Sequence, residues 1–73
     1  MLNDYAQTLA QQWQDENGLW IVRPTEDKSQ LEEIWRNWQD MPPQDKRLSD
    51  EKSIELFGMD NTSHYEILQL MYV

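Results

Sequence analysis

Residues 29–41 read SQLEEIWRNWQDM, and this stretch decides the fold class. Its apolar residues recur at the spacing of one helical face. They are Leu31, Ile34, Trp35, Trp38 and Met41. Ser29 and Glu32 have the spacing of a capping box, in which each side chain binds the backbone amide of the other residue. The Pro42-Pro43 pair cannot continue a helix. The pattern therefore predicts a helix that begins at Ser29 and ends before Pro42.

The residues before this helix predict another helix and a short extended segment. Apolar residues lie at helical spacing within residues 2–16, and Gly18 supplies the left-handed residue that commonly ends a helix. Residues 19–22, LWIV, are rich in β-branched and aromatic side chains and stand before Pro24, which favours an extended backbone. Because no partner strand is evident, this segment is either a packed irregular linker or an edge open to pairing.

The residues after Pro43 predict two further helices. We interpret residues 44–47 as a charged connector and Ser49 as the cap of a short helix that ends at Gly58. Ser63 and Glu66 repeat the capping-box spacing and start a last helix that runs to residue 73. This helix is apolar almost all round, so it must be buried in the domain or in a partner.

Together these elements predict a mainly α fold: a single small domain over residues 1–73 with three or four short helices and one short extended segment. The alternative is an α+β fold with a minor strand pairing. We expect a core built from residues on the apolar faces of the helices. They are Leu9, Trp13, Ile34, Trp35, Trp38, Ile54, Phe57, Ile67 and Leu70.

The chain is strongly acidic, with 6 Lys and Arg against 14 Asp and Glu and a net charge of −8. The net charge is −3 over residues 1–22, −1 over residues 23–47 and −4 over residues 48–73. Because nucleic acid is a polyanion, direct binding to DNA or RNA is disfavoured.

Cysteine content and hydropathy indicate the compartment. The chain has no cysteine, and its first residues have neither the basic start nor the apolar core of a signal peptide. No apolar run approaches the ~20 residues that cross a bilayer. We therefore expect a cytoplasmic protein with no membrane contact, which folds without disulfides or cofactors.

Catalytic patterns are weak in this sequence. His64 is the single histidine, and a metal or acid–base site needs several convergent ligands or an oriented nucleophile. We expect His64 to face solvent in the first turn of the last helix, and we expect no metal site. With only Gly18 and Gly58, no phosphate-binding glycine loop can form. Residues 53–71 resemble a helix-turn-helix, but their acidity opposes contact with phosphates, and an αα-hairpin is the simpler interpretation. The chain is interpreted as a non-enzyme.

Three functional classes remain. The first is a small acidic interaction protein, of the kind that phages and plasmids carry as accessory factors. It would bind and inhibit a basic nucleic-acid-handling protein, such as a repressor, a restriction or CRISPR effector or a polymerase subunit. The second is a structural or regulatory homo-oligomer that uses the apolar C-terminal helix. The third is a weak DNA-binding domain. For the first class, the predicted contact residues combine acids with two aromatic anchors. They are Asp50, Glu51, Glu55, Asp60, Glu66, Trp20 and Tyr72.

Overall fold

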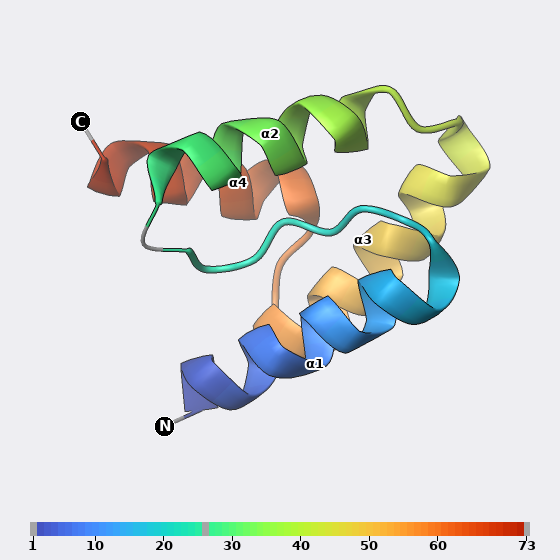
Figure 1. Ribbon diagram of the computed structural model, residues 1–73, viewed down its shortest axis with the longest axis horizontal. Helices are drawn as coiled ribbons and strands as arrows, with labels where there is room; N and C mark the ends of the chain where they lie inside the picture. Colours follow the sequence, from blue (N-terminus) through green and yellow to red (C-terminus); the bar gives the residue numbers. More distant parts are fainter. Residues whose placement is uncertain (1, 26, 73) are drawn as a thin grey trace.

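Four helices and no strand form among residues 2–25 and 27–72, which are the residues that the computed structural model describes. The helices are α1 (Leu2–Asn17), α2 (Lys28–Gln39), α3 (Pro43–Phe57) and α4 (Asn61–Met71) (Figure 1). The mainly α prediction is confirmed. The radius of gyration of the Cα atoms is 11.1 Å, close to the ~11 Å expected of a compact domain of this length. Val73, which we placed in the last helix, lies outside the described residues.

Helices α2 and α4 begin after an aspartate instead of the predicted serine. Asp27 Oδ1 accepts the backbone amide of Ser29 at 2.8 Å, and Asp60 Oδ1 accepts that of Ser63 at 2.9 Å. The two predicted capping boxes, with Ser29 and Ser63 as N-caps, are therefore wrong. Both serines lie inside the helices, because a carboxylate earlier in the chain already satisfies their amides.

Helix α3 is longer than predicted. It begins at Pro43, so residues 44–47 are helical, and the interpretation of these residues as a connector is wrong. A proline suits the first helical position because its φ angle is preset and the amide it lacks would have no partner there. The predicted ends of α1 and α3 are confirmed, since Gly18 and Gly58 both have left-handed φ angles, 68° and 80°.

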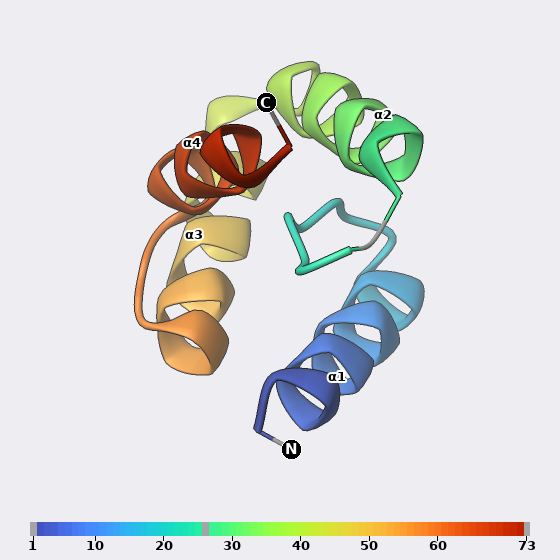
Figure 2. The ribbon, with the colours of Figure 1, turned by 90° about the vertical axis from the view of Figure 1, so that its left-hand side faces the viewer.

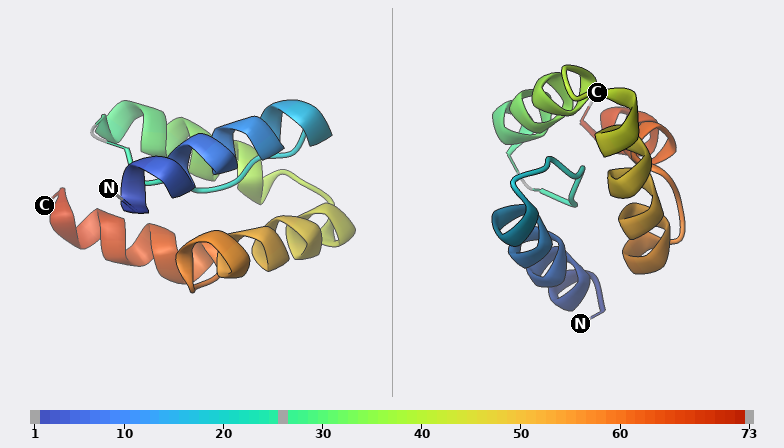
Figure 3. Two further views of the ribbon diagram at one scale, coloured as in Figure 1. Left: turned by 90° about the horizontal axis from the view of Figure 1, so that it is seen from below. Right: turned by 90° about the vertical axis from the view of Figure 1, so that its right-hand side faces the viewer.

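The linker between α1 and α2 passes through the middle of the molecule. Figures 2 and 3 show it between α1 and α2 on one side and α3 and α4 on the other. Its backbone is bound by side chains and not by a neighbouring strand. The Trp20 amide donates to Met41 Sδ at 3.2 Å, and the Trp20 carbonyl accepts Ser49 Oγ at 2.7 Å. The segment 19–22 is therefore a packed irregular linker, and the extended segment and the minor strand pairing are not confirmed.

A buried asparagine joins the linker to α3 and α4. Asn61 is fully buried, and its Oδ1 accepts the Val22 amide at 2.8 Å. Its Nδ2 donates to Ser49 Oγ at 3.0 Å and to Asp50 Oδ1 at 2.8 Å. All of the hydrogen-bonding capacity of the Nδ2 group is thus used inside the domain, which offsets the cost of burying it.

The core forms where the linker meets α2 and α4. It contains Val22, Leu31, Ile34, Tyr65 and Leu68. The predicted burial of Ile34 and Trp38 is confirmed, whereas Leu9, Trp13, Trp35 and Phe57 are half-buried. The predicted burial of Ile54, Ile67 and Leu70 is wrong, because all three are exposed. The linker takes up the interior, and α3 faces it with the small, buried side chain of Ser49, whose Oγ donates to the Trp20 carbonyl.

Candidate partner-binding surface

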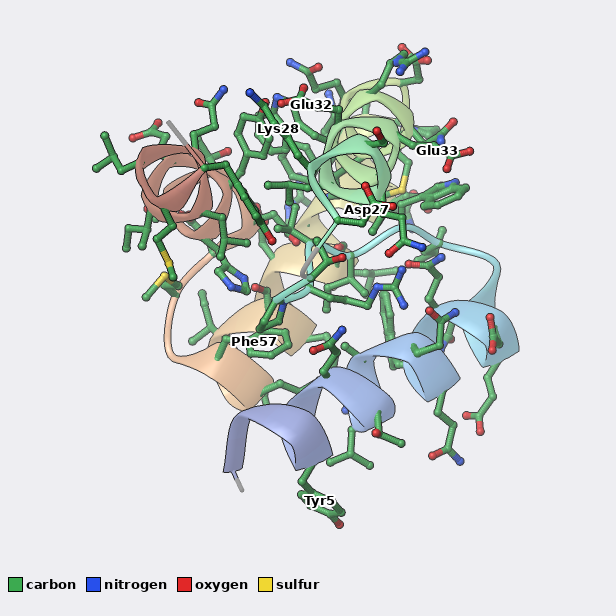
Figure 4. All side chains as sticks on the ribbon, turned by 60° about the vertical axis from the view of Figure 1, so that its left-hand side comes forward. Tyr5, Asp27, Lys28, Glu32, Glu33 and Phe57 are labelled. Carbon is green, nitrogen blue, oxygen red and sulfur yellow. The ribbon has the colours of Figure 1, made fainter. Side chains whose placement is uncertain are left out.

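An open groove of about 630 Å³ lies between α1, the C-terminal end of α3 and α4. We call it the α1–α4 groove. Large apolar side chains from all three helices line it, among them Tyr5, Leu9, Leu56, Phe57, Ile67 and Met71. Tyr5, Ile67 and Met71 are exposed, and Figure 4 shows the Tyr5 ring pointing outward from α1. Of the described residues that line the groove, Glu55 alone carries a full charge. The groove is therefore an exposed apolar surface within an acidic protein.

His64 forms part of the wall of this groove. Only 6% of the residue is exposed, and its ring lies 4.8 Å from the ring of Phe57, measured between centroids. The prediction that it faces solvent is wrong, because α4 begins at Asn61 and thereby turns His64 to the same side as Leu68. Burial lowers the pKa of His64, and a backbone contact with Val22 raises it less.

The surroundings of His64 do not form a catalytic pair among the described residues. Its Nδ1 atom is buried and has no hydrogen-bond partner there, and its ring contact is aromatic. General acid–base catalysis needs a group within hydrogen-bond reach of the reacting atom, and nucleophilic catalysis needs an oriented base. A neutral imidazole in an apolar wall fits packing better than proton transfer.

The structure separates the five predicted acidic contact residues into two groups. Glu51, Glu55 and Glu66 have exposed side chains, and Glu51 and Glu55 line one concavity beside Trp13 of α1. Asp50 and Asp60 bind inside the domain, since Asp50 accepts from Asn61 and Asp60 caps α4. Glu51 and Glu66 can therefore meet a partner without loss of a side-chain contact within the domain, whereas Glu55 would exchange its ion pair with Lys52.

The two predicted aromatic anchors, Trp20 and Tyr72, are partly buried and pack against the core cluster. Both backbone polar groups of Trp20 are bound, the amide by Met41 and the carbonyl by Ser49. Neither side chain lies on the α1–α4 groove. Their contact with a partner stays a prediction.

The remaining carboxylates are largely without cations. Among the described side chains one ion pair forms, between Lys52 Nζ and Glu55 Oε2 at 2.7 Å. The acids at the end of α1, Asp15 and Glu16, accept hydrogen bonds from the neutral amides of Gln11 and Gln12. Most of the carboxylates that the structure describes therefore keep their negative charge without a cation in contact.

A polar concavity on α1 surrounds Arg23 and is lined by Gln7, Gln11 and Asp15 among others. Burial lowers the pKa of Arg23, and the charge of Asp15 acts in the opposite direction. The Nε atom of Arg23 is buried without a partner among the described residues. Because the Asp15 carboxylate lies beside it, the Arg23 guanidinium belongs to a surface of mixed charge. This concavity therefore lacks the cluster of cations that an anion-binding site needs.

Periodicity alone did not locate the α1–α4 groove or Asn61. Ile67 was assigned to the core because it lies at helical spacing, although the apolar character of α4 on nearly all sides already indicated a surplus face. Asn61 stands in the polar run MDNTS, where nothing distinguishes a buried asparagine from an exposed one.

Neither a metal centre nor a membrane span emerges from the part of the chain that the structure describes. No three His, Cys, Asp or Glu side chains gather there as metal ligands would, and none of its helices has both the length and the apolarity to cross a bilayer. Comparisons with protein-family models, curated proteins and solved structures gave no match.

Proposed function

We propose that this chain is a non-enzymatic acidic interaction protein that binds and inhibits a basic nucleic-acid-handling protein. The observation that carries the proposal is the exposed, largely unpaired set of carboxylates, with one ion pair among the described side chains. A cationic nucleic-acid site is the complementary surface for such a charge distribution. Repressors, restriction or CRISPR effectors and polymerase subunits all carry sites of this kind.

Inhibition follows from competition for the same cations. In this proposal, the partner's Lys and Arg side chains that otherwise hold phosphates form ion pairs with exposed carboxylates of this chain. These carboxylates are Glu51, Glu55 and Glu66. The charges of these exposed glutamates mainly set the association rate, because they attract the partner over a distance before contact. Their effect weakens as the salt concentration rises. The desolvated apolar contacts mainly set the dissociation rate.

The first experiment is a pull-down with the tagged chain from its native host, at low and at high salt, with mass spectrometry of the retained proteins. The proposal expects a basic nucleic-acid-binding protein that is lost at high salt. It also expects that the pure chain does not shift a random DNA duplex at ordinary salt, because the net charge opposes phosphate contact. Retention of acidic or neutral proteins only, or a clear duplex shift, contradicts it.

The second experiment locates the charge contact. The double variant Glu51→Lys with Glu55→Lys should slow association with the retained partner steeply at low salt and change dissociation little. Asp15→Lys with Glu16→Lys is the matched control, because it makes the same change of charge on exposed acids of another helix. Equal slowing in both variants would mean that only net charge matters and that α3 is no specific contact.

A homo-oligomer is the second candidate function. The observation that favours it is the exposure of Ile67, Leu70 and Met71 on α4, which leaves this helix with an uncovered apolar face. Sedimentation equilibrium of the pure chain distinguishes the two candidates. A concentration-dependent dimer that Leu70→Gln dissociates would favour the homo-oligomer.

A further inference from the structure

We infer that the α1–α4 groove binds a single amphipathic helix of the partner, with apolar residues on the face that enters the groove and Lys or Arg on its flanks. This inference rests on the proposed function and names the contact that function requires. Three features point to such a helix: the residues that line the groove, the net charge of the chain and the hydrogen bonds of the linker.

The lining calls for an apolar face. Met71 and Tyr5 approach the groove from different helices, and 73% and 66% of these residues are exposed. Ile67, also exposed, lines the same groove, as do the buried residues His64 and Leu68. Single exposed apolar residues are ordinary, but large ones from two helices that converge on one groove are typical of an interaction site.

The charge around the groove calls for cationic flanks. Apart from Pro24, the residues that line it belong to residues 1–22 and 48–73, which carry net charges of −3 and −4, and no Lys or Arg of the described residues is among them. The net charge of −8 on the chain disfavours fatty acids, phosphates and other anions as ligands of the groove. A second copy of the chain would bring a further net charge of −8 to the contact. A basic amphipathic segment is favoured in two ways: its apolar face is buried in the groove, and the cations on its flanks are attracted to the acidic chain.

The backbone hydrogen bonds call for a helix. Addition of an extended segment needs an exposed strand edge, and no strand forms among the described residues. In the linker, the backbone amides of Ile21 and Val22 are already bound, to Gln14 Oε1 and Asn61 Oδ1. A helix satisfies its own backbone groups, so it can lie in an apolar groove and contribute side chains alone.

The test uses a fluorescent synthetic peptide that forms a helix with Leu on one face and Lys on its flanks. Its binding to the full chain is measured by anisotropy, and the contacted residues are mapped by amide chemical shifts. Met71→Gln should weaken binding about tenfold, as loss of a central apolar contact does. Leu70→Gln is the matched control, since Leu70 is equally exposed on the same helix but does not line the groove. It should weaken binding less than about twofold.

Several outcomes overturn the inference. They are equal loss in both variants, equal binding of a scrambled Leu–Lys peptide that forms no apolar face, and chemical-shift changes away from α1 and α4. Dimerisation that Met71→Gln abolishes and Leu70→Gln leaves intact would assign the groove to a second copy of the chain and overturn it too.

The same variants separate this inference from the proposed function. If a basic partner is captured and Met71→Gln binds it as the parent does, the inference fails and the proposed function stands. If the helical peptide binds as expected but no basic protein is captured, the proposed function fails and the groove remains a helix-binding surface.

Discussion

Asn61 Oδ1 accepts the backbone amide of Val22 at 2.8 Å, across 39 positions of the chain. This bond holds the buried linker against the start of α4, and the Nδ2 atom of the same side chain binds α3 through Ser49 and Asp50. One side chain therefore joins three segments that have no local reason to meet.

Asn61→Ala should destabilise the domain by about 2–4 kcal/mol, because it leaves the Val22 amide unpaired in the interior and removes two further hydrogen bonds. The free energy of unfolding in urea measures the effect. Asn37→Ala is the control, since Asn37 donates only to the Glu33 carbonyl on its own helix. Equal losses in the two variants would show that the network contributes little.

Stability should fall as the pH drops below about 6.5, the unfolded pKa of histidine. Burial lowers the pKa of His64 in the folded state, so the unfolded chain takes up the proton more readily. The contribution of neutral His64 to the free energy of unfolding is complete above the histidine pKa of the unfolded chain. It is lost as the pH falls through the lower pKa of the folded chain. Urea unfolding at pH 7.5 and 5.5 measures it. His64→Gln should lose less stability over this interval than the parent, and an identical loss in both would refute the assignment.

Tyr65→Phe should cost about 1–2 kcal/mol, because the hydroxyl lies 3.0 Å from both oxygens of the Glu32 carboxylate and donates to it. Burial raises the pKa of Tyr65, and the hydrogen bond and the charge of Glu32 raise it further. That part of the stability is complete below the unfolded tyrosine pKa of about 10 and is lost as the pH rises through the folded one. Thermal melts from pH 8 upward should show a steeper alkaline loss in the parent than in the variant. Parallel curves would contradict this.

Trp38→Ala should be more damaging than Trp35→Ala. Trp38 is buried, and loss of a buried tryptophan costs about 3–5 kcal/mol. Trp35 is half-buried and stacks between Trp38 and Tyr65, with ring centroids 5.0 Å and 4.2 Å away. Its removal loses the stack but leaves a site that water can reach. Urea midpoints of the two variants give the order, and a larger loss for Trp35→Ala would place the centre of the core at that ring.

The helical class, the helix ends at Gly18 and Gly58, and the burial of Ile34 and Trp38 were all predictable from the residues. These features depend on neighbouring residues, since backbone freedom at glycine and the spacing of one apolar stripe act within a turn or two. The acidic character of the surface also follows from composition. Which acids are available to a partner did not follow, because the sequence does not distinguish Asp50 and Asp60 from Glu51 and Glu66, and only the hydrogen bonds of the two aspartates do.

The tertiary structure alone decided which face of α4 is buried and where the α1–α4 groove lies. Helix α4 is apolar on nearly every side, so the spacing of its apolar residues does not indicate which face is buried. In the fold, Tyr65 and Leu68 pack in the core with Val22 of the linker, whereas Ile67 and Leu70 are exposed. The hydrogen bond from the Val22 amide to Asn61 Oδ1 fixes the linker to the start of α4, and its partners are far apart in the chain. A hydrogen bond between residues so far apart leaves no repeating pattern in the sequence. The exposed apolar face of α4 can therefore be identified only in the folded chain.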